Sequence, residues 1–180
     1  MALITLMLIY DKSGNAVHGV CAAVFHESGH LITMLLSGDS PQKISVGIYG
    51  IRIERHEKTC ISYPVEILIA LAGPLFNLTI AMLMTLFNRD MTVSVRMNIV
   101  IALFNLLPLT PLDGGRVLYY VLCSVKNISF ASKITKIITA LGIVPLTVIG
   151  LLLFINNKQD YSLLLSSLYV SFALLSLPYN

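Results

Sequence analysis

Long apolar runs alternate along this chain with short polar segments. Full-length runs cover about residues 16–36, 65–87, 134–154 and 161–177. Each is near the ~20 residues that an α-helix needs, at ~1.5 Å per residue, to cross a ~30 Å hydrocarbon core. A membrane β-barrel would show alternating apolar segments instead. The pattern therefore predicts an all-α polytopic membrane protein.

A further apolar run begins near Met97 and is broken before it resumes at residues 117–125. The break, residues 108–115, contains two prolines and two adjacent glycines. Non-helical backbone at membrane depth is tolerated only where it is buried in protein or lines a wet cavity. We also expect an interruption of the second run at residues 72–74, which are Ala-Gly-Pro.

The polar segment at residues 42–62 has a different period. Apolar residues alternate there with small or polar ones around Tyr49-Gly50, at Ile44, Val46, Ile48, Ile51 and Ile53. This period of two predicts a short β-hairpin. The segment also holds four of the twelve Lys and Arg residues, so we expect the hairpin at a membrane surface.

Composition excludes several classes of protein. Of the 180 residues, 56% are hydrophobic and 12% charged, against roughly 25% charged in soluble domains. This excludes a disordered chain and disfavours a water-soluble enzyme, and a scattered net charge of +3 does not predict nucleic-acid binding. Three widely spaced cysteines, Cys21, Cys60 and Cys123, indicate neither a disulfide framework nor a zinc ribbon. Without repeats or linkers, residues 1–180 are expected to form a single membrane-embedded domain.

Basic residues give an expected orientation. Met1–Ile9 is apolar but too short to span a bilayer alone, and it lacks the basic leader of a signal peptide. If it is counted as a crossing, one side receives seven basic residues and the other four: Lys43, Arg52, Arg55, Lys58, Lys126, Lys133 and Lys136 against Lys12, Arg89, Arg96 and Lys158. The excess predicts that both termini and the hairpin are cytoplasmic.

The first full run contains His26-Glu27-Ser28-Gly29-His30. Helical geometry places His26 and His30 one turn apart on one face, where both imidazoles can bind one cation. Glu27 lies beside them and can take a proton from water, as in HExxH metalloproteases. The alternative, two solvated or capping histidines on a soluble helix, is disfavoured because both flanks are apolar.

A catalytic zinc site needs a third protein ligand, with water in the fourth position. Asp113 is favoured, since an acidic residue among prolines and glycines inside a membrane is a strained choice without a cation. Its alternative role is to cap the helix that resumes at Val117. Glu66 lies near a span end, where it can snorkel, and His18 is off the azimuth of His26 and more consistent with a hydrogen bond. The remaining candidates belong to the hairpin: Glu54, His56 and Glu57.

Three motifs in this order resemble the site-2 protease family of intramembrane zinc proteases, peptidase family M50. They are the HExxH segment 26–30, Ala72-Gly73-Pro74 with Asn77, and Leu112-Asp113-Gly114-Gly115. The resemblance covers about residues 16–125 and implies a three-helix metalloprotease core, with residues 134–177 as accessory helices. It implies one Zn²⁺ per chain on His26, His30 and Asp113, with Glu27 as general base.

The stretch from Asn105 to Arg116 looks most like the stage IV sporulation protein FB branch, whose substrate is an inactive sigma-factor precursor. No nucleotide-sensing (CBS) or PDZ domain is recognised in the chain, which leaves ATP regulation and the substrate open. The resemblance implies an integral protein of a bacterial cell membrane, a membrane-associated protein substrate and a membrane inhibitor or regulator as partner.

The resemblance also points to two asparagines. Asn105 is expected to stabilise the oxyanion, or alternatively to bond the backbone freed by Pro108. Asn77 is expected to orient substrate, or alternatively to tie two helices by a hydrogen bond. The edge of the hairpin could receive an extended substrate strand. Competing functions are a catalytically silent membrane regulator, a metal transporter and a metallohydrolase of lipid-modified substrates.

Overall fold

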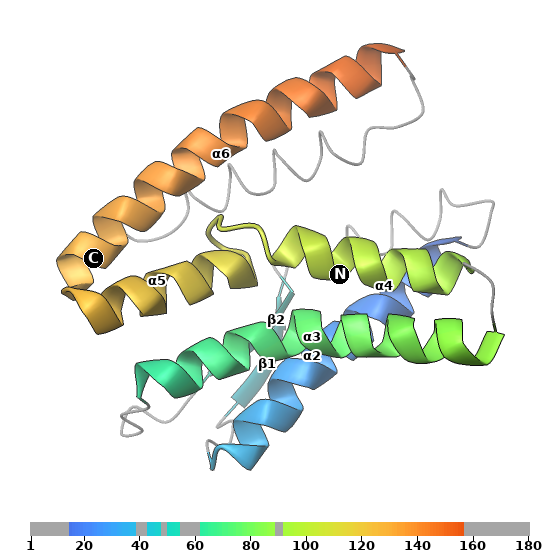
Figure 1. Cartoon of the computed structure of the whole chain (residues 1–180), viewed down its shortest axis with the longest axis horizontal. Helices are drawn as coiled ribbons and strands as arrows, with labels where there is room; N and C mark the ends of the chain where they lie inside the picture. Colours follow the sequence, from blue (N-terminus) through green and yellow to red (C-terminus); the bar gives the residue numbers. More distant parts are fainter. Residues whose placement is uncertain (1–14, 39–42, 48–49, 55–61, 89–91, 157–180) are drawn as a thin grey trace. The chain divides into compact units, whose positions relative to one another are not determined.

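The computed structural model describes residues 15–38, 43–47, 50–54, 62–88 and 92–156. Their elements, in chain order, are α2 (Asn15–Leu36), β1 (Lys43–Gly47), β2 (Gly50–Glu54), α3 (Tyr63–Asn88), α4 (Val93–Asn105), α5 (Asp113–Val125) and α6 (Ile128–Asn156), shown in Figure 1. The predicted helices at 1–9 and 161–177 lie outside the described residues. The chain divides into two compact units, Met1–Asn105 and Leu106–Asn180, and each is described by itself.

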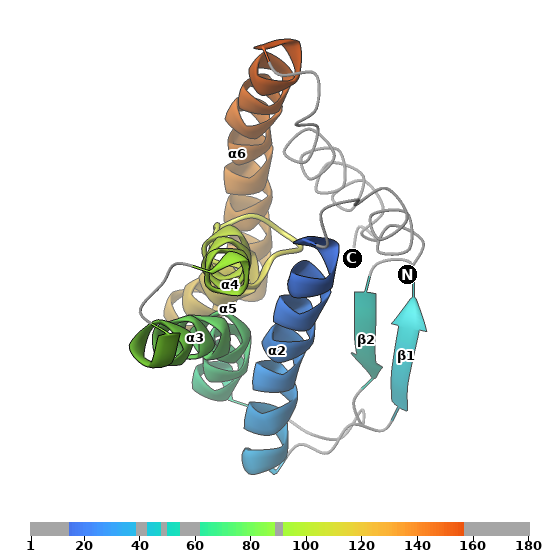
Figure 2. The same ribbon diagram turned by 90° about the vertical axis from the view of Figure 1, so that its right-hand side faces the viewer.

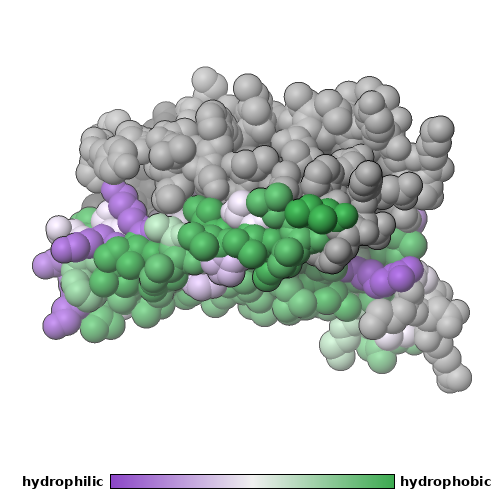
Figure 3. Space-filling model, turned by 90° about the horizontal axis from the view of Figure 1, so that it is seen from above, coloured by the Kyte–Doolittle hydropathy of each residue, from purple (hydrophilic) through white to green (hydrophobic). Residues whose placement is uncertain are grey.

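Three of the described helices are long and apolar enough to cross a membrane: Val17–Leu36, Tyr63–Phe87 and Ile128–Ile149. Many of their large apolar side chains point outward; Leu36 and Phe87, for example, are each 84% exposed. Figure 3 shows one face on which most of the described residues are hydrophobic. Such a surface is unfavourable in water and favourable in lipid. The prediction of several apolar helices is confirmed.

In the first unit, α2 crosses α3 and α4, which lie side by side (Figures 1 and 2). Small residues make this packing close. A Cβ atom added at Gly29 of α2 would lie 2.6 Å from the carbonyl oxygen of Ala72 and 2.8 Å from Cβ of Phe76 on α3. The buried apolar residues between the helices are also mostly small, among them Ala22, Ala70, Ala81 and Ala102. Backbones that approach through small side chains are typical of membrane helix pairs.

Helix α3 continues through the Ala-Gly-Pro segment, so the interruption expected there is wrong. Pro74 lacks the N–H that would bond the carbonyl of Ala70, but the helix keeps its course for a further fourteen residues, to Asn88. Pro74 is fully buried within the unit. Neighbouring helices commonly allow a proline inside a membrane helix.

Strands β1 and β2 pair antiparallel, with Lys43 opposite Glu54 and Gly47 opposite Gly50 (Figure 2). Two apolar pairs, Ile44–Ile53 and Val46–Ile51, alternate with the polar pair Ser45–Arg52. Residues 42, 48–49 and 55–61 of the predicted hairpin lie outside the described residues.

In the second unit, α5 and α6 form an antiparallel helical pair (Figure 1). Helix α6 begins at Ile128, six residues before the predicted start, because Asn127 caps it: its Oδ1 accepts a hydrogen bond from the N–H of Phe130 at 2.8 Å. Helix α5 begins at Asp113, four residues before the predicted start, and includes both glycines of its first turn.

Helix α4 likewise begins before the predicted start, at Val93 rather than near Met97. Thr92 stands before it, and its Oγ1 accepts a 3.4 Å hydrogen bond from the N–H of Val95. Polar residues at helix ends thus explain two of the boundaries that hydropathy alone placed too late.

The close approach at Gly29 leads to a first prediction. We expect Gly29→Ala to destabilise the protein by about 1–3 kcal/mol, because the added methyl group would meet backbone that cannot move aside. The same substitution at Gly19, also on α2, meets nothing within 4 Å and should be neutral or slightly stabilising. Unfolding of both variants in detergent tests this, and equal stabilities would refute the close packing.

Candidate metal centre

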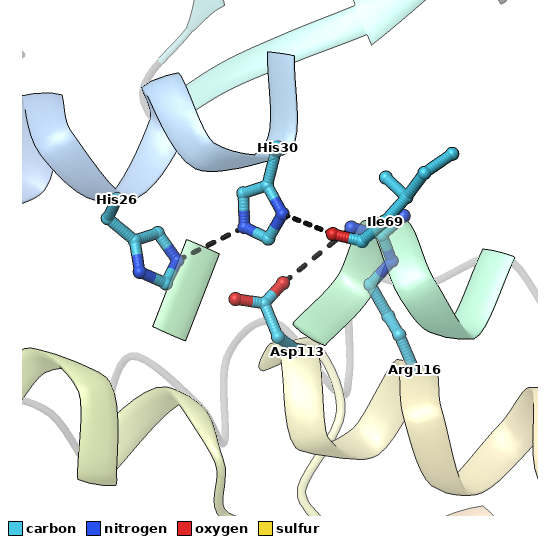
Figure 4. A network of polar contacts seen from close by, with 5 residues as sticks. All are labelled: His26, His30, Ile69, Asp113 and Arg116. Carbon is cyan, nitrogen blue, oxygen red and sulfur yellow. Dashed lines mark hydrogen bonds and ion pairs between the residues drawn. The ribbon is translucent and has the colours of Figure 1, made fainter. Parts of the chain in front are cut away.

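The two histidines of the HExxH segment lie one turn apart on α2, as predicted, and point toward one another (Figure 4). Their Nε2 atoms are 3.2 Å apart, and each residue is only 6% exposed. Two bare nitrogen lone pairs at this distance repel, so either a proton or a cation must lie between them. Tetrahedral Zn²⁺ with bonds of 2.0–2.1 Å separates two nitrogen ligands by roughly 3.3–3.4 Å. The observed separation fits that geometry.

A backbone carbonyl fixes the tautomer of His30. Its Nδ1 lies 2.7 Å from the carbonyl oxygen of Ile69 on α3 (Figure 4). Because that oxygen can only accept, Nδ1 carries the proton and Nε2 of the neutral ring keeps its lone pair. This second contact is common among metal-binding histidines, whose other ring nitrogen is bonded to a carbonyl or carboxylate.

The histidine rings occupy the space that a side chain at Gly73 would fill. A Cβ atom there would overlap Nε2 of His30 and would lie 2.6 Å from its Cε1 and 2.9 Å from Cε1 of His26. The glycine of the Ala-Gly-Pro motif therefore makes room for both rings. The motif alone does not indicate this local role for its glycine.

Asp113 is the first residue of α5, and Leu112, not Asp113, stands at the N-cap position. The carboxylate is buried, and its Oδ1 lies 3.6 Å from Nη1 of Arg116, one turn further on (Figure 4). A negative charge is favoured in the first turn of a helix. The sequence alone left two settings open for Arg116, snorkelling or contact with a carboxylate, and the structure shows the second.

The donor types suit zinc. The expected ligands are His26 and His30 of the first unit and Asp113 of the second, and each of the three is buried. Two imidazoles and a carboxylate form a known ligand set of catalytic zinc, which leaves a fourth position for water. Glu27, next in sequence to His26, is partly exposed.

The two asparagines differ in their surroundings. Asn77 on α3 is 0% exposed, and in the described part of the chain neither of its side-chain atoms has a hydrogen-bond partner. The alternative in which it ties two helices by a hydrogen bond is therefore not seen there. Nδ2 of Asn105 donates to the carbonyl of Ile101, one turn earlier on α4, at 3.0 Å.

His18 and Glu66, which the sequence disfavours as zinc ligands, have different surroundings. Nδ1 of His18 is hydrogen-bonded to Oγ of Ser94 on α4 at 2.7 Å, as its position predicted. Glu66 was expected to snorkel outward from a span end, but it is 8% exposed and faces the protein interior. Its position in the first turn of α3 does not bring it to the surface of the unit.

Comparison with known proteins adds three findings. The model of peptidase family M50 matches residues 88–149, about a third of the chain, including Asp113 but neither histidine of α2. A curated protein of Synechocystis sp., named as a candidate zinc metalloprotease, is 27% identical in an alignment of 172 residues that covers 83% of this chain and 42% of that protein. The solved site-2 protease of Methanocaldococcus jannaschii shares the fold, with a TM-score of 0.71, 24% identity and coverage of 96% of this chain and 83% of that one.

These matches support the M50, or site-2 protease, family. All three are peptidases by name, and the name of the curated relative includes zinc. Together with the apolar helices, they support an integral membrane protein. The chain spans less than half the length of the curated relative.

The space at Gly73 gives a second prediction. We expect Gly73→Ala to weaken zinc binding at least tenfold, because the new methyl group would displace both imidazole rings. Zinc affinity of purified protein, measured by competition with a chromophoric chelator, tests this. Gly19→Ala is the matched control and should bind like the native chain. Native affinity in Gly73→Ala would show that the rings do not need this space.

Proposed function

We propose that this protein is an intramembrane zinc metalloprotease that cleaves a peptide bond of a membrane-associated protein. The observation that carries the proposal is the buried His26–His30 pair, whose Nε2 atoms are 3.2 Å apart and whose His30 ring is fixed by the carbonyl of Ile69. Buried imidazoles on an apolar helix are costly, and a bound cation is the usual reason for them.

The proposed site holds one zinc ion on His26, His30 and Asp113. Bound zinc acidifies water and polarises a carbonyl group. Glu27 accepts the proton from the attacking water and later gives it to the leaving amine. The amide of Asn105 has two N–H groups; one donates to Ile101, and the other is the proposed oxyanion donor.

Asn77 is proposed to meet the substrate. Its buried amide has no hydrogen-bond partner among the described residues, and an unpaired buried amide costs free energy that a bound peptide group would recover. Asn77 follows Gly73 by four residues, so both lie on the same face of α3. Gly73 is the residue against which the histidine rings pack.

The finer identity follows the sequence resemblance. We propose a bacterial cell-membrane protein with both termini cytoplasmic, the β-hairpin at the membrane surface and a membrane protein as its regulator. A sigma-factor precursor in sporulation is the proposed substrate. The stretch from Asn105 to Arg116 supports this branch of the family.

Zinc content of detergent-purified protein tests the site. We expect about one zinc per native chain and a large loss in Asp113→Ala, because two imidazoles alone hold zinc weakly. Native protein that stays metal-free in zinc-replete buffer would favour a silent regulator. Zinc fully retained in Asp113→Ala would move the third ligand elsewhere.

Glu27→Gln separates binding from chemistry in the same preparation. It should keep its zinc and lose activity, since the amide cannot accept the proton. Labelling of new peptide N-termini in membranes that express each protein measures cleavage without a known substrate. Termini inside apolar spans, formed by the native chain and absent with Glu27→Gln, are expected. Equal termini with both would contradict the protease.

The hairpin is the proposed docking edge for substrate. A peptide in a helix is shielded from attack, and an extended peptide could pair with a free strand edge by main-chain hydrogen bonds. The sheet has two strands, so each strand has one edge that pairs with no other strand of the sheet. Val46→Pro on β1 and Ile51→Pro on β2 each remove one backbone N–H that a substrate strand could bond. We expect at least one to reduce cleavage about tenfold or more, as counted from new N-termini, while zinc content stays native. Unchanged cleavage in both variants would rule out strand pairing.

A further inference from the structure

The loop that precedes Asp113 folds back over the helix that it starts. A Cβ atom at Gly114 would overlap the carbonyl oxygen of Leu106, and one at Gly115 would lie 2.6 Å from the carbonyl carbon of Leu109. Residues 106–112 thus rest directly on the first turn of α5. The position of this loop therefore sets the position of Asp113, the first residue of α5.

Two backbone hydrogen bonds lie within the loop. The N–H of Leu109 donates to Leu107, and the N–H of Leu112 donates to Leu109, both at 2.7 Å. Pro108 and Pro111 have no N–H to give. Thr110 is different: its N–H donates to Oγ1 of Thr139 at 3.0 Å, on helix α6. Figure 1 shows the loop rising from α5 toward α6.

The hydroxyl of Thr139 uses its full bonding capacity. It donates to the carbonyl of Thr135 at 2.8 Å, accepts from the N–H of Thr110, and lies 2.9 Å from Oγ1 of Thr110. A hydroxyl has one hydrogen to donate and two lone pairs, so the hydroxyl of Thr110 is the donor in the last contact. Thr139 is fully buried, and water cannot replace these bonds easily.

We propose that Thr139 is a positioning residue, which anchors residues 106–112 to α6 and so fixes the carboxylate of Asp113 for metal binding. Helix α6, an accessory helix by sequence, becomes part of the support of the site. The inference rests on the proposed function, in which Asp113 is a zinc ligand. Outer residues that orient a ligand commonly change metal affinity 10–100-fold when they are replaced.

The test compares three variants of the full chain in detergent. Thr139→Val keeps the shape and removes the hydroxyl, whereas Thr139→Ser keeps the hydroxyl. Thr147→Val is the matched control: Thr147 lies on the same helix and makes the same bond to the carbonyl four residues earlier, Ile143, at 2.8 Å. Hydrogen exchange of a peptide that covers residues 106–112 reports the anchor, and zinc affinity by chelator competition reports the site.

We expect Thr139→Val to speed exchange in the loop and to weaken zinc binding, each about tenfold. Thr139→Ser should restore both values, and Thr147→Val should match the native chain. Native exchange and affinity in Thr139→Val would overturn the proposal. An equal loss in Thr139→Val and Thr147→Val would overturn it too, since the effect would then be general destabilisation.

Two outcomes need a further measurement: a Thr139→Val variant that does not fold, and a native chain that binds no zinc. If Thr139→Val does not fold, Thr110→Val, which removes the hydroxyl at the other end of the contact, takes its place and should give a smaller change of the same sign. If the native chain binds no zinc, the proposed function fails. Loop exchange then decides alone whether Thr139 anchors the loop, so the two failures are distinguishable.

Discussion

The close approach of helices α2 and α3 is the constraint on which the histidine pair depends. It occurs at two glycines, which have no side chain. Gly29 lets α2 lie against the backbone of α3, and Gly73 leaves space for both imidazole rings. Without this approach the carbonyl of Ile69 could not reach His30 at 2.7 Å. Close packing of small residues thus sets the tautomer and the ring orientation of the buried His30 imidazole. The association of α2 and α3 therefore prepares this ring to bind a metal.

In the second unit, the loop before Asp113 is held by glycine contacts and by a side-chain hydroxyl. Its loop of residues 106–112 has two prolines and so too few N–H groups for regular structure. It is held instead by contact with Gly114 and Gly115 and by the hydroxyl of Thr139. In an apolar environment the loss of such a bond costs more free energy than in water, because no water can replace the lost partner.

Buried polar groups mark the regions where this apolar protein departs from simple packing. Asn77 and Oγ1 of Thr135 have no hydrogen-bond partner among the described residues, and each carries a desolvation cost. Asn77 lies on the face of α3 that also carries Gly73, whereas Thr135 neighbours the anchor at Thr139 on α6. A protein with 56% hydrophobic residues retains few such groups, which makes each of them informative.

The sequence by itself determined the apolar helices and the face shared by His26 and His30, because these follow from periodicity along one segment. It misjudged Pro74 as a break and missed the caps at Thr92 and Asn127, since neighbouring residues decide such points. Only the tertiary structure supplied the carbonyl of Ile69, the space at Gly73 and the bond from Thr110 to Thr139. These join residues 29 to 47 positions apart, and a backbone carbonyl or a missing side chain leaves no pattern in the sequence to indicate its partner.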